Sequence, residues 1–279
     1  MVTTIGGSAM KIHRGIVVGA LLLTAGFLSV GGMVKDLLLT DVKSPGVQQR
    51  GLLHDLREIA AKDGRLDYLV LGDSVALGKG SAKEEGYGYW VAEYLKDNGI
   101  DVHLDNRAVS GQTSDQLLRS LGDRDLLSQI ERSDLISITI GGNDLLKAVL
   151  HHENPLDALK KFRHIQDRYR DNLHAILEQI RLHNPRAPIL ITSLYNPVEP
   201  EEPYFPIVQK LLKQWNAGMK EVVRTYPDAS VIDVDRRLPP NDRNWLADEI
   251  HPNDWGYQLM AKGMLESIRG KVSEAVSEQ

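Results

Sequence analysis

The chain has 279 residues, a net charge of −5 at pH 7 and no cysteine. The absence of cysteine excludes disulfides, zinc–thiolate sites and thiol catalysis. Lys and Arg form no long block in the sequence, which argues against nucleic acid as a partner, because binding to phosphates needs clustered basic side chains. With 42% hydrophobic and 25% charged residues, the composition is typical of a folded globular domain.

An uncharged, mostly apolar segment lies near the start of the sequence, at residues 15–34. As a helix it would be about 30 Å long, which matches the thickness of a bilayer core. Lys11 and Arg14 stand before it, and basic residues on that side favour a cytoplasmic N-terminus. We therefore assign residues 1–35 to a hydrophobic helix that anchors the chain in the membrane, so that the remainder lies outside the cytoplasm.

Two questions about this segment stay open at the level of the sequence. The small residues around Ser29 and Gly31 form a candidate cleavage site, so the alternative is a signal sequence that is removed from a secreted protein. Met10 is followed by basic and then apolar residues, the pattern of an export signal. Met1 and Met10 are therefore both candidate starts.

The remaining chain divides into a spacer, residues 36–65, and a domain, residues 66–279. The spacer contains one predicted helix, because leucine and isoleucine recur at helical spacing before Gly64. In the domain, apolar runs alternate with amphipathic segments, a pattern that predicts a parallel sheet with helices on both faces. We expect an α/β fold, a flavodoxin-like three-layer sandwich. Its strands are predicted at residues 68–71, 102–109, 135–140, 189–194 and 231–234, and its helices at residues 89–98, 114–121, 145–152, 156–183, 204–226 and 255–267.

Residues that can carry chemistry follow each predicted strand. Because the carboxyl ends of parallel strands meet at one edge of a sheet, these residues are expected to converge there. In chain order they are Ser74, Gly111, Asn143, the segment from Tyr195 to Pro197, and the pair Asp248 and His251.

These residue types suit nucleophilic catalysis by a serine. A neutral imidazole at His251 can accept the Ser74 proton and return it to a leaving group, and Asp248 can orient that imidazole. The amides of Ser74 and Gly111 and the side chain of Asn143 can donate hydrogen bonds to an oxyanion. One such donor contributes about 3–4 kcal/mol to lowering the barrier.

Four motifs in this order resemble the four blocks of the SGNH (GDSL) hydrolases. They are Gly72-Asp73-Ser74, the Gly111 that follows Asn106, Gly141-Gly142-Asn143-Asp144, and the Asp248-to-Pro252 segment. The likeness covers about residues 66–270 and is greatest to extracytoplasmic lipase-like esterases of Gram-positive bacteria. Val75 stands where the family often has leucine, and it is apolar like leucine.

The resemblance implies the SGNH fold and hydrolysis of carboxylic esters through an acyl-serine, with no metal or cofactor. It implies that Ser74 is the nucleophile, that Gly111 and Asn143 are oxyanion donors, and that Asp248 and His251 are the acid and the base of the triad. The substrate stays open among lysophospholipids, short-chain esters, thioesters and acetylated cell-wall glycans. A membrane-proximal position favours a lipid or an acylated envelope polymer, and the sequence does not indicate the oligomeric state.

Other interpretations of the motifs fit less well. Each motif alone is typical of a helix cap or a turn, but caps and turns do not explain the ordered set. A phosphate loop needs four residues between its glycines, whereas five separate Gly72 from Gly78. The residues around His151 resemble a solvated helix end more than a metal site. The competing functional class is a non-catalytic, membrane-anchored binding protein on the same scaffold.

Overall fold

The computed structural model describes residues 52–83, 85–149, 155–239 and 241–270. The predicted anchor at residues 1–35 and the segment around His151 lie outside these residues. In the described part of the chain, no helix is long and apolar enough to cross a membrane.

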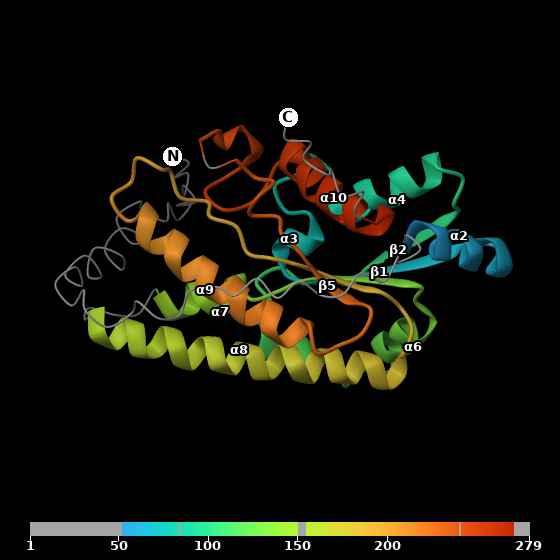
Figure 1. Ribbon diagram of the computed structural model, residues 1–279, viewed down its shortest axis with the longest axis horizontal. Helices are drawn as coiled ribbons and strands as arrows, with labels where there is room; N and C mark the ends of the chain where they lie inside the picture. Colours follow the sequence, from blue (N-terminus) through green and yellow to red (C-terminus); the bar gives the residue numbers. More distant parts are fainter. Residues whose placement is uncertain (1–51, 84, 150–154, 240, 271–279) are drawn as a thin grey trace, which may run out of the picture.

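A parallel sheet of five strands forms the centre of the molecule (Figure 1). Its spatial order is β2-β1-β3-β4-β5, which is the flavodoxin-like order. The predicted fold class is therefore confirmed. The strands are β1 (Leu66–Gly72), β2 (Val102–Asn106), β3 (Leu135–Thr139), β4 (Ile189–Thr192) and β5 (Ala229–Ile232).

Helices cover both faces of the sheet and give the sandwich its outer layers (Figure 1). On one face lie α2 (Leu52–Asp63), α3 (Ser74–Leu77), α4 (Tyr87–Asp97) and α10 (Asp254–Arg269). On the other lie α5 (Ser114–Ser120), α6 (Arg124–Arg132), α7 (Gly142–Val149), α8 (Pro155–His183) and α9 (Phe205–Val223). A short 3-10 helix, η2 (Arg243–Trp245), precedes α10.

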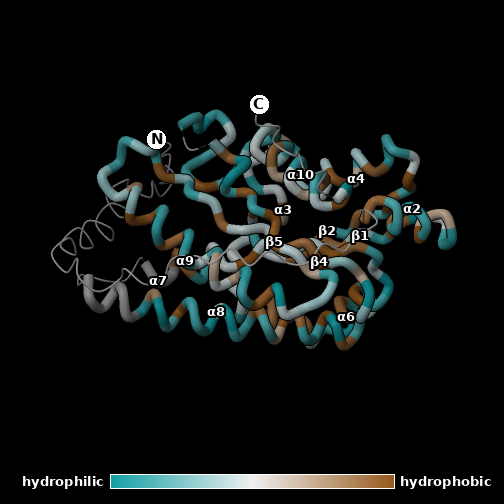
Figure 2. Tube along the Cα trace, in the orientation of Figure 1, coloured by the Kyte–Doolittle hydropathy of each residue, from teal (hydrophilic) through white to brown (hydrophobic). Residues whose placement is uncertain are grey.

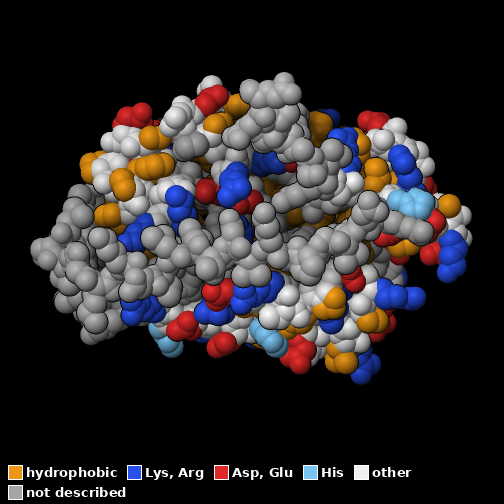
Figure 3. Space-filling view, viewed as in Figure 1, with side chains coloured by type: hydrophobic (Ala, Val, Ile, Leu, Met, Phe, Trp, Pro, Cys, Tyr) orange, Lys and Arg blue, Asp and Glu red, His pale blue; other side chains and the backbone are white. Residues whose placement is uncertain are grey.

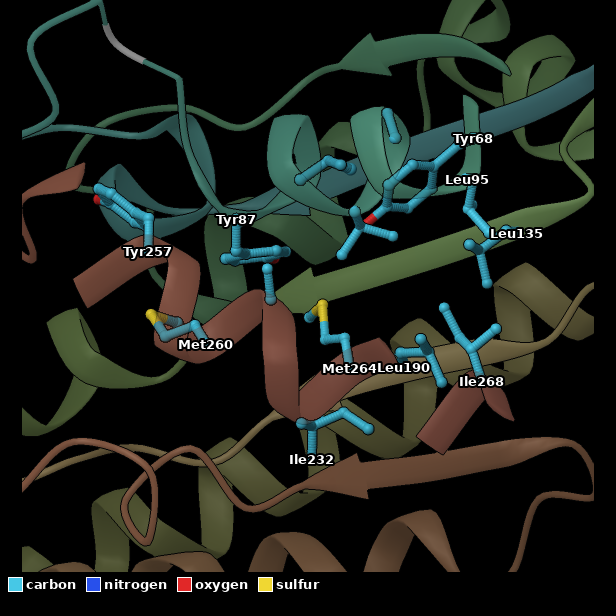
Figure 4. Packing of buried hydrophobic residues seen from close by; sticks show 14 of the residues in the cluster. Tyr68, Tyr87, Leu95, Leu135, Leu190, Ile232, Tyr257, Met260, Met264 and Ile268 are labelled. Carbon is cyan, nitrogen blue, oxygen red and sulfur yellow. The ribbon is translucent and has the colours of Figure 1, made fainter. Parts of the chain in front are cut away.

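Two apolar cores, one on each face, hold these layers together. Strand residues alternate between them, so that Tyr68 and Val70 belong to one core and Leu69 and Leu71 to the other. Figure 4 shows the first core, where Met264 of α10 packs among side chains of the sheet and of α4. Figure 2 shows hydrophobic residues along the inner strands. Burial on both faces explains why the strands appear in the sequence as continuous apolar runs.

The structure differs from the predicted elements in several places. The sequence pattern did not reveal α3, which is a single turn, or α6, whose residues are mostly polar. Helix α7 begins at Gly142 rather than at Leu145, which brings Asn143 into its first turn. Helix α2 packs on the domain through Leu56, whose side chain is fully buried. Helix α2 is therefore part of the packed structure, together with the elements from β1 onward.

Gly72 occupies a position that only glycine fits, and it gives the first prediction. Its φ is +129°, and a Cβ there would lie 2.0 Å from the carbonyl oxygen of Thr139 on β3. Gly72→Ala should lower the free energy of unfolding by about 3 kcal/mol or more, because the neighbouring backbone must move. Urea unfolding measures this change.

Gly99→Ala is the matched control. Gly99 has a φ of +80° and no atom within 4 Å of its Cβ position, so it carries the backbone penalty alone, about 1–2 kcal/mol. Equal losses in the two variants would contradict the steric account of Gly72.

Candidate active site

Ser74 lies at the carboxyl end of β1, as the first residue of α3. The Oδ1 atom of Asp73 caps this single helical turn by accepting the amide N–H of Val75 at 3.0 Å. Gly78 ends the turn in a left-handed conformation, with a φ of 99°. Glycine and aspartate on either side of the turn thus fix the backbone that carries the serine.

His251 connects Ser74 to Asp248. Its Nε2 lies 3.0 Å from the Oγ of Ser74, and its Nδ1 lies 2.8 Å from Oδ2 of Asp248. The imidazole is buried, with 5% of the residue exposed. The structure therefore brings the three residues into one hydrogen-bonded chain, as the convergence of strand ends predicts.

Asp248 is held in an environment that favours its charged form. Its Oδ1 accepts the amide N–H groups of Ile250 at 2.9 Å and of His251 at 2.8 Å. Partial burial on its own would raise the pKa of Asp248, but the two amides and the imidazole together hold this pKa below its usual value. A carboxylate thus faces His251 at neutral pH.

One local and one long-range set of contacts hold the loop that carries Asp248 and His251. The amide of Ala247 donates to the carbonyl of His251 at 2.8 Å, within a short antiparallel bridge from Leu246 to Pro252. The hydroxyl of Tyr195, which follows β4, donates to the carbonyl of Ile250 at 2.6 Å. The sequence suggested Tyr195 as a candidate site residue, but only the structure shows that it supports this loop.

Asn143 lines the same groove as Ser74, and Gly111 lies next to Gln112, the residue that Asn143 contacts. The Nδ2 of Asn143 donates to the carbonyl of Gln112 at 3.0 Å, and an amide of this kind has a second hydrogen to donate. Gly111 has a φ of +78° and no atom within 4 Å of its Cβ position. The left-handed backbone favours glycine at this position, and the open space over it leaves the amide accessible.

A buried polar network, which the sequence did not reveal, joins the Gly111 loop to α7. Asp144 accepts the amide of Ser114 at 2.9 Å and its hydroxyl at 2.5 Å. The Oγ of Ser114 in turn accepts from Asn172 of α8 at 2.9 Å. Ser114 and Asp144 are buried, so this network fixes the helix that follows Gly111 against the helix that carries Asn143. In the sequence, the aspartate that follows Asn143 is the only local sign of this network.

An apolar groove of about 220 Å³ opens at Ser74 and His251. Its walls come from α7, from the segment after β4 and from α9. The apolar lining residues are Val75, Leu145, Leu146, Leu194, Tyr195, Pro197, Val198, Val208, Leu211, Leu212 and Ile250. Among the residues that the structure describes, no group of three or more histidine or acidic side chains could hold a metal ion.

Asp73 gives a prediction on stability. Burial, the largest effect, and the nearby Asp144 raise its pKa from 3.8 to about 7, although the amides of Val75 and Ala76 act in the opposite direction. Because the folded-state pKa exceeds that of an unfolded chain, ionising Asp73 opposes folding increasingly as the pH rises from about 4 to about 7.

Asp73→Asn keeps an oxygen for the cap and removes the charge. Relative to wild type, this variant should therefore gain about 2 kcal/mol of stability between pH 5 and pH 8. Urea unfolding at the two pH values measures the gain, and a difference that does not change with pH would contradict a buried, neutral Asp73.

Comparison with known proteins agrees with the geometry. A model of the GDSL-like lipase/acylhydrolase family matches residues 70–259. The chain is 28% identical over 216 residues to the spore germination lipase LipC of Bacillus licheniformis, a match that covers 74% of this chain and 98% of that protein. It is also 28% identical over 205 residues to the uncharacterized protein YpmR of Bacillus subtilis, covering 72% of this chain and 80% of that protein.

Solved structures share the fold. The lipase Lip_vut3 from a goat rumen metagenome has 26% sequence identity and a TM-score of 0.66, and the match covers 74% of this chain and 99% of that chain. TesA, at 19% identity, has a TM-score of 0.57 over 73% of this chain and 98% of that chain, and shows a likeness of fold alone. The family match spans most of the sandwich, from β1 into α10, so the chain belongs to the GDSL-like lipase/acylhydrolase family and is an ester hydrolase.

Proposed function

We propose that this ester hydrolase cleaves carboxylic esters through an acyl-enzyme formed on Ser74. The observation that carries the proposal is the hydrogen-bonded chain from Ser74 through His251 to Asp248. Serine is a weak nucleophile unless a base removes its proton, and Nε2 of His251 lies within hydrogen-bonding distance of its hydroxyl.

In the first step, Oγ of Ser74 attacks the ester carbonyl carbon while its proton moves to Nε2 of His251. The tetrahedral intermediate then collapses, the bond to the alcohol oxygen breaks, and the imidazolium gives its proton to the departing alcohol. In the second step a water molecule attacks the acyl-serine with His251 again as the base. The bond from the acyl carbon to Oγ of Ser74 then breaks, the imidazolium returns a proton to Oγ, and the carboxylic acid leaves. Asp248 stabilises the imidazolium in both steps.

Three donors are assigned to the oxyanion of each tetrahedral intermediate. They are the amides of Ser74 and Gly111 and the side chain of Asn143. The bond from Asn143 to Gln112 holds the side-chain amide beside the Gly111 loop, and the buried Asp144 network keeps these segments from moving apart. Donors that are fixed in advance need no reorganisation as the charge develops.

The setting of the reaction is also part of the proposal. We propose that residues 1–35 attach the enzyme to the membrane, or direct its secretion if they are cleaved, so that the site works outside the cytoplasm. The uncharged segment of residues 15–34 supports this assignment. Esters of lipids or of acylated envelope polymers are then the substrates within reach, and the likeness to a spore germination lipase is compatible with the first of these.

Removal of the nucleophile is the direct test. Ser74→Ala should lower kcat/KM for p-nitrophenyl acetate by about 10³-fold or more, since the base then has no hydroxyl to activate. Ser110→Ala, which removes an exposed hydroxyl from the neighbouring loop, should leave the rate unchanged. Wild-type turnover by the purified Ser74→Ala variant would contradict the proposal and favour a non-catalytic binding protein.

Replacement of Asp248 tests the orientation of the imidazole. Asp248→Asn can still accept an amide N–H, but its own NH₂ group cannot accept from Nδ1 of His251. We expect kcat to fall by about 10²- to 10⁴-fold because the imidazole loses its partner and its preferred tautomer. Glu249→Gln, at an exposed position of the same loop, is the control, and equal rates for the two variants would contradict the assigned role.

A further inference from the structure

We propose that the apolar groove beside Ser74 binds the acyl chain of the substrate and selects medium-length chains of roughly six to ten carbons. The inference rests on the proposed acyl-serine mechanism and adds a substrate class to it. It excludes acetylated glycans as the preferred substrates and favours esters of fatty acids.

The lining of the groove indicates an apolar occupant. On α9, Val208, Leu211 and Leu212 line it, and their spacing places them on one face of the helix. Leu145 and Leu146 of α7, which follow Asp144, line it as well. The same groove is lined by Ser74 and His251, so aliphatic side chains and the reacting groups share one space, which suits an ester carbonyl followed by a hydrocarbon chain.

Apart from the reacting groups, the hydroxyls in the lining already bond within the protein. The hydroxyl of Thr139 lies 2.8 Å from that of Tyr87 and 2.7 Å from that of Thr192. The Oγ of Ser193 accepts the amide of Val234 at 3.0 Å. A sugar ring in this groove would lose hydration of its hydroxyls and gain few partners, whereas a hydrocarbon chain loses nothing by leaving water.

The volume of the groove matches a chain of medium length. A cavity of about 220 Å³ holds about seven groups of the size of a water molecule, whose share of liquid volume is about 30 Å³. A methylene group is of similar size, so an acyl chain of about eight carbons fills the groove. Leu146 and Ile250 line it and remain 37% and 42% exposed, which allows a somewhat longer chain to continue toward the surface.

The surface near the groove is also apolar. Figure 3 shows hydrophobic side chains gathered over the start of α9 and the segment before it. Pro197 and Val198 belong to that segment and line the groove. A chain that leaves the groove on this side therefore meets further hydrocarbon.

The mechanism favours the acyl chain over the alcohol as the occupant. The alcohol oxygen must stay near Nε2 of His251 to receive its proton, and the alcohol departs after the first step. The acyl chain remains on Ser74 through both steps, so a groove that holds it helps to position the carbonyl in each of them.

The first experiment is an acyl-length profile of the wild-type enzyme. p-Nitrophenyl esters from acetate to palmitate keep the alcohol constant, and each methylene buried in the groove is worth about fourfold in affinity at most. We expect kcat/KM to rise at least tenfold from acetate to octanoate and to fall again for palmitate. A profile that is flat or highest at acetate would overturn the groove proposal, while turnover of acetate would keep the proposed function intact.

The second experiment fills the groove. Val208→Trp and Leu211→Trp should each lower the ratio of kcat/KM for octanoate to kcat/KM for acetate at least tenfold, and the remaining acetate turnover reports a folded, active enzyme. Lys213→Trp places the same side chain on an exposed position of α9 and should change neither rate. If neither groove variant alters the ratio of octanoate to acetate turnover, the groove does not bind the acyl chain.

A third measurement separates the two chains of the ester. Alkyl acetates from ethyl to octyl lengthen the alcohol and leave the acyl group constant. We expect kcat/KM to vary less than threefold across this series. A rise that matches the acyl series, and that Val208→Trp abolishes, would assign the groove to the alcohol and overturn the proposal.

Discussion

The hydrogen bond between Nε2 of His251 and Oγ of Ser74 joins residues 177 positions apart in the chain, and the proposed chemistry depends on it. Two features of the fold make it possible. Gly72 turns the chain sharply at the end of β1, where any side chain would meet the backbone of β3. At the other end of the domain, the bridge from Leu246 to Pro252 and the hydroxyl of Tyr195 hold the loop that presents the imidazole.

The site also contains two buried carboxylates, which help to fix its shape. Asp73 and Asp144 are each 3% exposed, and a buried carboxylate is costly unless it is neutralised or well bonded. Asp73 caps the turn at Ser74, and burial raises its pKa to about 7, so that about half of it is uncharged at neutral pH. Asp144 bonds twice to Ser114 and so aligns two of the segments to which we assign oxyanion donors. Burial of these two carboxylates lowers local stability, but their hydrogen bonds hold the proposed oxyanion donors in a fixed arrangement.

Much of this arrangement could be predicted from the sequence, and the reasons are physical. Strands buried on both faces appear as apolar runs, and the parallel order that they imply is enough to place Ser74, Asn143 and His251 at one edge of the sheet. The sequence could not reveal contacts that depend on packing between distant segments, such as those of Tyr195 with Ile250 and of Asp144 with Ser114. The apolar groove was also hidden, because its walls come from α7, from α9 and from the segment after β4, which have no common sequence signal.

The most direct test of the central claim is covalent labelling with a fluorophosphonate, followed by mass spectrometry of the digested protein. The reagent reacts only with an activated serine, so the account predicts one adduct, on the peptide that contains Ser74, and none after the protein is denatured. An adduct on another serine, or a folded protein that takes up no label, would contradict the assignment of Ser74 as the nucleophile.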